Sequence, residues 1–524
     1  MKFSAPVKEL LESFGDSTAT DREAGDSSVS HTISTLAVLY EKARNAIEFR
    51  ADHLVRRAAI ERIIKRRLLT NKTASTIAEN LLLELLWAKY IDSSLVDEQT
   101  MKKVTQILDR YLLLKSKHFT RHLKNTSMSW ETVLGIASSE IDEAIFPAHK
   151  RDALVKFFYL AIRPKIQVDG VKTELMDTYV YIAIGRTYIQ ADDNLILFHL
   201  LKMSQPGWFI SNSGKSSTYS KNLIKALEIV EKSLKDPIVN KIQKYIRKQM
   251  PPFLLLRDFL LESEDDVTEL VGDKEEFNDI LDNLARRRYL EIGVKVKRSI
   301  IRSFIYIFLT KMVFALALEL PYDLYVIKEV VYLPLAVNTL FPPFILVFLA
   351  GLFSVPDEKN TKKLIMNINA IIYNFETYRK NGDRFILEEP QKRPVLTTIF
   401  SAIYLGTFAL TFGLINAGLT ALNFSFVSKV IFVFFLAIVS FFAYHIRLSS
   451  REYSMEEKQS LFGTLIDFFF LPILLAGQVV SRGMAKLNMF VFFFDFILEA
   501  PLKTVFEFLE EWFRFISMKR EEII

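Results

Sequence analysis

The feature that most constrains this chain is a series of long apolar segments after residue 300. Four of them are long enough for a helix to cross a bilayer, which takes about 20 apolar residues. Inside a membrane every backbone N–H and C=O group needs an internal partner, so such segments fold as helices. The sequence therefore predicts an all-α chain that ends in a polytopic transmembrane bundle. The four spans are expected at 300–318, 330–353, 395–422 and 426–446.

Two further apolar segments, 461–480 and 487–500, lie near the C-terminal end. The second is short for a crossing and also fits a re-entrant or interfacial segment, so their topology stays open. Residues 501–520 place apolar side chains on one stripe and charged side chains opposite, which predicts an amphipathic helix. Such a helix suits the membrane interface, and it equally suits docking on a soluble domain or a second subunit.

The distribution of Lys and Arg predicts the orientation of the spans. Basic residues gather before the first span, in the 354–394 connection and after the fourth span, whereas 319–329 and 423–425 hold a single Lys. Basic loops stay on the cytosolic side. We therefore expect a multi-pass protein of the cell (inner) membrane with both termini and the 354–394 loop in the cytosol. Arg482 and Lys486 weigh against two further crossings.

The first part of the chain reads as soluble. Residues 1–30 are polar and acidic enough to predict a disordered tail with one short helix at "PVKELLESF". Helical periodicity over 31–290 predicts a cytosolic all-α domain. The membrane domain is expected at 291–447, and a C-terminal membrane module at 448–524. The chain has no Cys, which excludes disulfides, thiolate catalysis and Cys-ligated metal centres.

Polar side chains at membrane depth are the main candidate functional residues, because such groups are costly in lipid. They are Lys311, Asn338, Asp467 and Asp495. Lys311 and Asp467 lie near the middles of their segments. One interpretation is an ion pair that removes two unpaired charges, which we favour. The other is a polar path lined also by Asn338, beside the Pro-broken second span, as in many transporters.

The third span carries small residues at four-residue spacing, namely Ala409, Gly413, Ala417 and Ala421. Such a face lets another helix approach closely. Packing within the bundle is the simpler use of this face, and a homodimer is the alternative.

The stretch "GWFISNSGKSST" (207–218) ends like a phosphate-binding loop. That motif needs a Gly five positions before Gly214, where this chain has Phe209. A bulky side chain there blocks close approach of the backbone to phosphate. We interpret the stretch as a linker between helices.

Two other patterns were weighed as metal sites. His118 and His122 are four residues apart, but Lys and Arg surround them and no carboxylate joins them. The acidic segment 262–283 lacks the spacing of a calcium loop. We expect no metal and no cofactor. The basic face around the His pair fits anionic lipid or an acidic partner better than nucleic acid, because aromatic side chains are not interleaved with the basic ones for base stacking.

No catalytic or nucleotide-binding motif is found, which weighs against an enzyme. The leading hypothesis is a non-enzymatic, membrane-anchored scaffold whose cytosolic domain recruits a protein partner. The alternative is a transporter or channel with a polar path near Lys311, Asn338 and Asp467. A membrane enzyme acting on lipid is a weaker third hypothesis.

Overall fold

The computed structural model describes residues 3–15, 52–70, 73–116, 129–210, 217–263, 267–328, 332–351, 356–381, 384–387, 394–455 and 470–481. Regular structure in these ranges is helical apart from two three-residue strands, so the nearly all-α character of the chain is confirmed. The chain divides into two compact units. Unit 1 comprises Met1–Leu281 and Leu364–Glu389, and unit 2 comprises Asp282–Lys363 and Pro390–Ile524.

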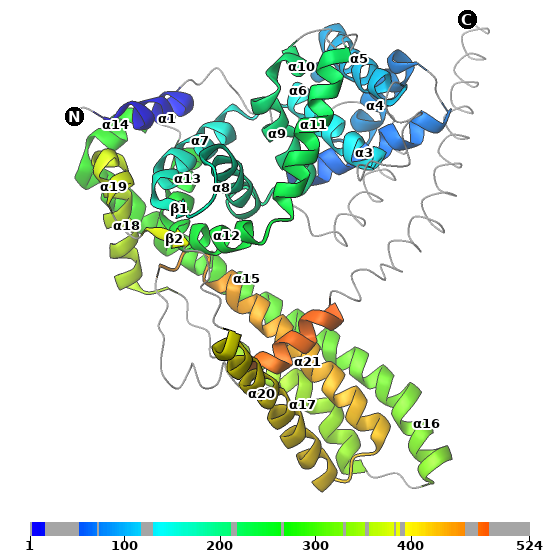
Figure 1. The fold of residues 1–524 in the computed structure, drawn as a ribbon. Coiled ribbons are helices and arrows are strands. Elements are labelled where there is room, and N and C mark those ends of the chain that lie inside the picture. The colour runs from blue at the N-terminus through cyan, green and yellow to red at the C-terminus, as the bar shows by residue number, and fades with distance from the viewer. Residues whose placement is uncertain are drawn as a thin grey trace, which may run out of the picture. The chain divides into compact units, whose positions relative to one another are not determined.

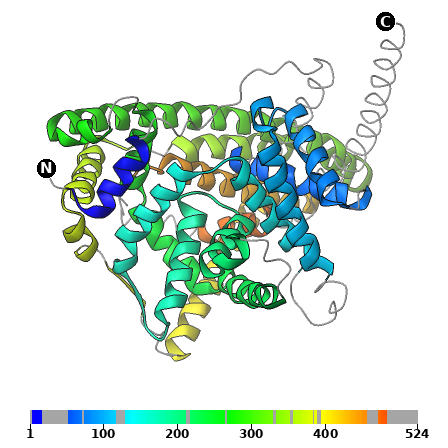
Figure 2. The same ribbon diagram turned by 90° about the horizontal axis from the view of Figure 1, so that it is seen from above.

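Unit 1 is an assembly of short helices (Figure 2). Several begin at a capping side chain: Asp97, Ser129 and Asp192 each accept a hydrogen bond from the backbone N–H three residues later. The helices are α1 (Ala5–Gly15), α3 (Asp52–Thr70), α4 (Ala74–Trp87), η1 (Ser93–Leu95), α5 (Glu98–Leu114), α6 (Trp130–Ile145), α7 (His149–Ile162), η3 (Arg163–Lys165), α8 (Thr173–Thr187), α9 (Asp193–Ser204), α10 (Pro206–Ile210), α11 (Ser217–Leu234), α12 (Pro237–Gln249), α13 (Pro251–Glu262), α14 (Val267–Gly272) and α19 (Phe375–Lys380).

Most side chains of helix α6 are buried, polar ones included. It packs against α3, α5 and α9. At Gly135 an added Cβ would lie 2.2 Å from Nδ2 of Asn194, so the missing side chain is what lets α6 and α9 approach closely. The buried polar positions of α6 are therefore enclosed by neighbouring helices.

The connection expected as a loop at 354–394 contains regular structure. It holds α18 (Glu358–Tyr373), α19 and strand β2 (Phe385–Leu387), and its part Leu364–Glu389 belongs to unit 1. There β2 pairs in parallel with β1 (Ile166–Val168). Phe375 also stacks on Phe157, with ring centroids 5.2 Å apart. A segment between two apolar helices thus completes the core of unit 1.

The short helix expected near the N-terminus is present as α1, and its apolar residues Val7, Leu10, Leu11 and Phe14 are buried. Burial of this apolar face stabilises the short helix. The rest of that tail, 16–30, lies outside the described residues, as do 482–524 with the expected segment 487–500 and amphipathic helix 501–520.

Unit 2 contains the apolar helices. They are α15 (Lys274–Phe314), which begins in unit 1, η5 (Ala315–Glu319), α16 (Leu320–Tyr322), η6 (Asp323–Ile327), α17 (Tyr332–Gly351), α20 (Pro394–Ala421), α21 (Phe426–Ser450) and a shorter helix, Phe470–Ser481. Four helical segments are long and apolar enough to cross a membrane: Lys274–Ile327, Tyr332–Leu349, Thr398–Ala421 and Phe426–Leu448. Each of these segments overlaps one of the four spans expected from the sequence.

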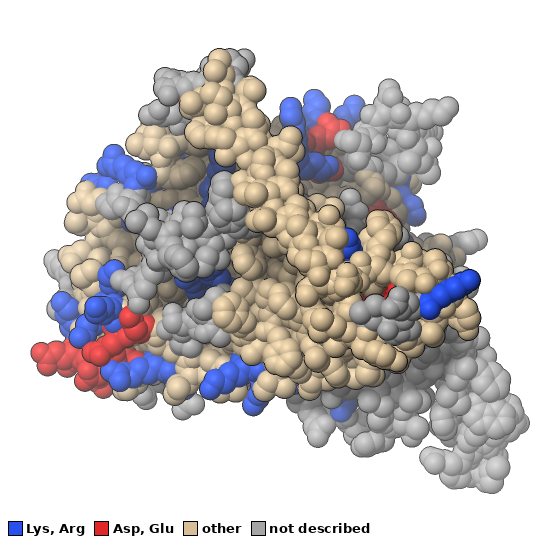
Figure 3. Space-filling view, turned by 90° about the horizontal axis from the view of Figure 1, so that it is seen from below, with Lys and Arg blue, Asp and Glu red and all other residues tan. Residues whose placement is uncertain are grey.

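Helix α21 is the centre of packing in unit 2, where it lies alongside α17 (Figure 1). Its residues Ile431, Phe435 and Val439 form a core cluster with Ile307 of α15 and Leu346 of α17. Half of its apolar window is buried, against 11% for α20. In the space-filling view uncharged residues cover a broad surface (Figure 3), and the exposed side chains of unit 2 include Ile305, Phe344 and Leu405. Such an apolar exterior is typical of helices surrounded by lipid.

Candidate functional site

Four buried polar side chains of unit 2 converge from four helical elements. They are Lys311 in the last turn of α15, Glu319 at the end of η5, Asn338 in α17 and Ser428 in the first turn of α21. None of them is more than 2% exposed. We refer to this group as the polar centre.

Glu319 is the common partner within the polar centre. The Lys311 ammonium donates to Oε1 of Glu319 at 3.2 Å, and Asn338 Nδ2 donates to Oε2 at 2.6 Å. The Ser428 hydroxyl donates to the same Oε2 at 3.4 Å. Lys311 Nζ also lies 4.7 Å from the ring centroid of Phe435, a favourable cation–π distance. One carboxylate thus links α15, η5, α17 and α21.

The start of α21 orients Ser428 toward the carboxylate. Ser425 caps the helix by accepting from the Ser428 backbone N–H at 3.3 Å, and its hydroxyl donates to Ser428 Oγ at 3.0 Å. Ser428 Oγ is then left to donate its own proton to Glu319. The Asn338 amide also donates to the Ser428 carbonyl at 3.3 Å. Because both partners of this Nδ2 are acceptors, the orientation of the amide is fixed.

An irregular helix segment places Glu319. Residues Ala315–Glu319 and Asp323–Ile327 are π-helical, and Pro321 lies between them. Proline lacks the N–H that an α-helix needs and clashes with the carbonyl four residues earlier, so wider turns accommodate it. Such segments are frequent at functional sites.

The polar centre is electrically neutral and closed. Both charges are paired, and both carboxylate oxygens accept hydrogen bonds. An unpaired charge at the centre of a bilayer costs about 3 kcal/mol. This arrangement can hold helices together through hydrogen bonds to a shared carboxylate.

One carboxylate next to the polar centre is less well satisfied. Asp323 follows Glu319 by four residues and is only 9% exposed, yet its Oδ1 has no hydrogen-bond partner. The Oδ1 atom of Asn338 is likewise buried without a partner. These two acceptors are the atoms of this region that a proton or a small cation could engage.

The structure brings together two of the four residues singled out from the sequence. Lys311 and Asn338 both contact Glu319. Asp467, the partner expected for Lys311, and Asp495 lie outside the described residues. The described ion pair of Lys311 is with Glu319 instead, because the helix of the first span continues past residue 318 and places that carboxylate about two turns further along.

Glu319, Asp323 and Ser428 were not predicted from the sequence. With the first span expected to end at 318, both carboxylates fell in a loop. The spacing of eight residues between Lys311 and Glu319 would have placed both on nearly the same helix face. Ser428 carried no comparable signal, because a Ser in the first turn of a helix is ordinary.

The small residues of α20 lie on an exposed face of unit 2. Ala409, Gly413, Ala417 and Ala421 are all exposed, and a Cβ added at Gly413 would meet nothing within 4 Å. Thr407 and Thr411 are buried instead. Packing by this face, within the bundle or in a dimer, stays a prediction.

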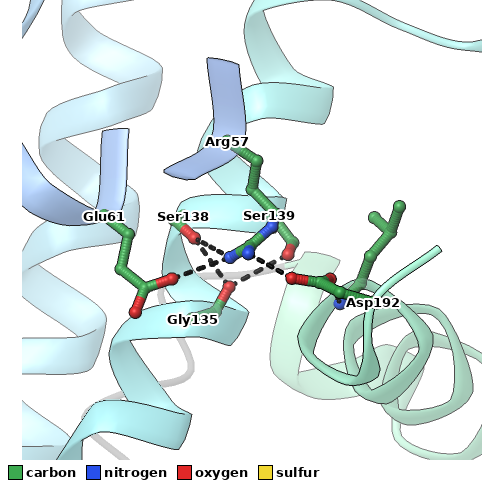
Figure 4. Close-up of polar contacts among 7 residues, drawn as sticks. Arg57, Glu61, Gly135, Ser138, Ser139 and Asp192 are labelled. Carbon is green, nitrogen blue, oxygen red and sulfur yellow. Dashed lines mark hydrogen bonds and ion pairs between the residues drawn. The ribbon is translucent and has the colours of Figure 1, made fainter. Parts of the chain in front are cut away.

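Unit 1 contains a second buried polar network, centred on Arg57 of α3 (Figure 4). The guanidinium donates to Glu61 at 2.8 Å and to Ser138 of α6 at 3.0 Å, and it pairs with Asp192. Asp192 also caps α9 by accepting from the Leu195 backbone N–H at 3.0 Å. This network joins α3, α6 and the start of α9 through charge-assisted hydrogen bonds.

A third network surrounds Glu140 of α6. Its carboxylate pairs with Arg110 and accepts a hydrogen bond from the Tyr111 hydroxyl at 2.9 Å. Burial raises the pKa of Glu140, and Arg110 opposes that rise. Arg110 also donates to the backbone carbonyl of Phe209 in α10 at 3.5 Å. The start of the glycine-containing stretch is therefore helix packed on the core, while 211–216 lie outside the described residues.

Neither pattern weighed as a metal site forms one in the described part of the chain. His118 and His122 lie outside it. In the acidic segment Asp273 accepts from the backbone N–H groups of Glu275 and Glu276, as a cap does. Among the described residues no group of three or more His, Asp or Glu side chains is placed to hold a metal ion.

No protein-family model matches the chain, and neither the curated proteins nor the solved structures contain a significant match.

Proposed function

We propose that the chain is a non-enzymatic, membrane-anchored scaffold. Its apolar helices span the cell (inner) membrane, and unit 1 lies in the cytosol, where it recruits a protein partner. Support for the anchor comes from four helices that are apolar enough to cross a bilayer. Support for a cytosolic unit 1 comes from the basic residues that flank those helices.

The closed ion pair favours a scaffold over a transporter. Lys311 and Glu319 are each 0% exposed and are bonded to each other. A substrate path needs polar groups that exchange partners with the cargo, whereas these two groups are neutralised by protein. A buried pair of this kind fits a role in fixing the register of the spans.

The test compares the intact wild-type chain with a double variant, Lys311→Leu with Glu319→Leu. Both proteins are captured from a mild detergent extract of crosslinked membranes, and co-purifying proteins are quantified. A scaffold predicts the same stoichiometric partner with both, because unit 1 is unchanged. The same two proteins in liposomes should give no ion flux above empty vesicles. Flux through the wild type that the double variant loses would contradict the proposal.

The transporter alternative rests on different atoms. Asp323 and Asn338 each keep one buried acceptor oxygen without a partner, and intramembrane carboxylates often bind protons or cations. If this alternative holds, Asp323→Asn should abolish a flux seen with the wild type while the protein stays folded.

A further inference from the structure

A stripe of unpaired cations runs along α15 where its apolar part begins. Lys295, Arg298 and Arg302 are spaced three and four residues apart, so they share one face of the helix. All three are exposed, and within the described residues none has an ion pair. The nearest acidic residue on that face, Glu291, is already bonded to Arg288 at 2.7 Å. We name Lys295, Arg298 and Arg302 the cationic stripe.

The stripe lies at the boundary between polar and apolar helix surface. Beyond Arg302 the exposed side chains of α15 are uncharged and mostly apolar, among them Ile305 at 52% and Leu309 at 49% exposed. The three cations extend over roughly 10 Å of helix at 1.5 Å per residue. The headgroup layer on one side of a bilayer is roughly 5–7 Å thick, so the stripe is long enough to extend across it.

A buried polar contact fixes which face of α15 points outward. Tyr289 lies on the opposite side of the helix from the cationic stripe, and its hydroxyl accepts a hydrogen bond from Asn360 Nδ2 at 2.8 Å. Asn360 also donates to the Tyr453 carbonyl at 2.8 Å, and its Oδ1 accepts from the Met455 N–H at 2.8 Å. With Tyr289 held inward, α15 cannot rotate to bury the stripe.

We propose that the cationic stripe binds the phosphate of anionic lipid headgroups. This inference rests on the membrane location proposed above. Guanidinium groups form paired hydrogen bonds with phosphate, and unpaired cations beside an apolar span attract anionic lipid. The occupant is lipid rather than nucleic acid, because exposed apolar residues that belong in the bilayer adjoin the stripe.

The test uses the full-length protein in nanodiscs of equimolar phosphatidylcholine and phosphatidylglycerol. Lipids that remain bound after mild extraction are counted by native mass spectrometry. The variant replaces Lys295, Arg298 and Arg302 by Gln. The matched control replaces Lys221, Lys225 and Lys232, exposed residues of α11, by Gln, which removes the same charge elsewhere. We expect enrichment of phosphatidylglycerol on the wild type and on the control.

The stripe variant should lose that enrichment by roughly tenfold, and high salt should weaken the wild-type preference. Equal enrichment on the stripe variant and the wild type would overturn the inference, and so would an equal loss in the control. A further variant, Lys297→Gln, changes the opposite face of α15 and should have little effect. If the wild type fails to remain in carbonate-washed membranes, the proposed function fails first. If it remains there without lipid preference, only this inference fails.

Discussion

The two units bury charges in different ways. In unit 1 helix α6 carries several buried polar groups, and its two buried carboxylates have separate arginines: Glu140 pairs with Arg110, and Asp142 with Arg56. In unit 2 a single carboxylate, Glu319, serves three donors from three helices. When unit 1 unfolds, water hydrates its charged side chains. When helices separate in a bilayer or micelle, their charged side chains remain near apolar surroundings. We therefore expect destabilising substitutions of buried charges to be spread over several positions in unit 1 and to be concentrated at Glu319 in unit 2.

The largest effect is expected from breaking one pair in unit 1. Arg110→Leu leaves the Glu140 carboxylate buried without its cation and should cost about 3–5 kcal/mol of unfolding free energy. The double variant Arg110→Leu with Glu140→Leu should recover much of that loss, because no uncompensated charge remains. Denaturant unfolding followed by Trp fluorescence measures both. A double variant as unstable as the single one would mean that packing, not charge, sets the cost.

The corresponding change in unit 2 is Glu319→Leu, which strands Lys311 among apolar helices. We expect a loss of about 3 kcal/mol, seen as a lower temperature at which the detergent-solubilised protein loses its monodisperse peak. Asp323→Leu is the matched control, since it removes a carboxylate four residues away whose Oδ1 has no partner. The control should be neutral or stabilising. Equal destabilisation by both changes would contradict the central role of Glu319.

A pH effect is expected in unit 1. Burial lowers the pKa of His199 to about 3, helped by Arg151 and Lys202. Below the ordinary pKa of 6.5 the unfolded chain takes up a proton that the folded chain refuses, so stability is fully present above that pH and falls as pH drops toward 3. The loss between pH 6.5 and 5 should be roughly 2 kcal/mol.

His199→Phe removes this titration and should flatten the pH dependence in that window. His149, whose side chain lies at the start of α7, provides the control variant His149→Phe. The measurement is the unfolding free energy at several pH values for all three proteins. If the unfolding free energy of His199→Phe still falls with pH in that window, other groups cause the pH dependence.

Much of the fold could be predicted from the sequence. The four apolar helices were found because hydrophobic length is a strong signal that lipid imposes directly on each segment. The continuation of the 354–394 segment into unit 1 could not be found, because the pairing of β1 with β2 depends on tertiary contacts between distant short strands.

The candidate site was predictable only in part. Lys311 and Asn338 stood out because each is polar within an apolar segment. Their shared partner did not, since Pro321 and the neighbouring charges made "ELPYD" resemble the end of a span. The π-helical turns that carry Glu319 inward arise from how the backbone accommodates that proline, which no hydropathy pattern records.

The smallest change in stability is expected from substitution of two glycines in unit 2, which should behave differently. At Gly477 an added Cβ would lie 2.1 Å from the carbonyl oxygen of Ala437 in α21, whereas at Gly413 it would meet nothing within 4 Å. Gly477→Ala should therefore separate the helix Phe470–Ser481 from α21 and lower stability by about 1 kcal/mol, at the lower end for overpacking because a peripheral helix can shift. Gly413→Ala should leave the stability of the monomer unchanged.

Substitutions at the same two glycines also test whether the small face of α20 pairs with a second copy. If it does, Gly413→Leu should shift crosslinked dimer to monomer without lowering monomer stability, because close helix approach requires small side chains. Gly477→Ala should leave any dimer intact while it loosens the monomer. If Gly413→Leu instead destabilises the monomer, a helix of the same chain packs against this face. More of the packing of unit 2 would then involve α20 than the exposure of that helix suggests.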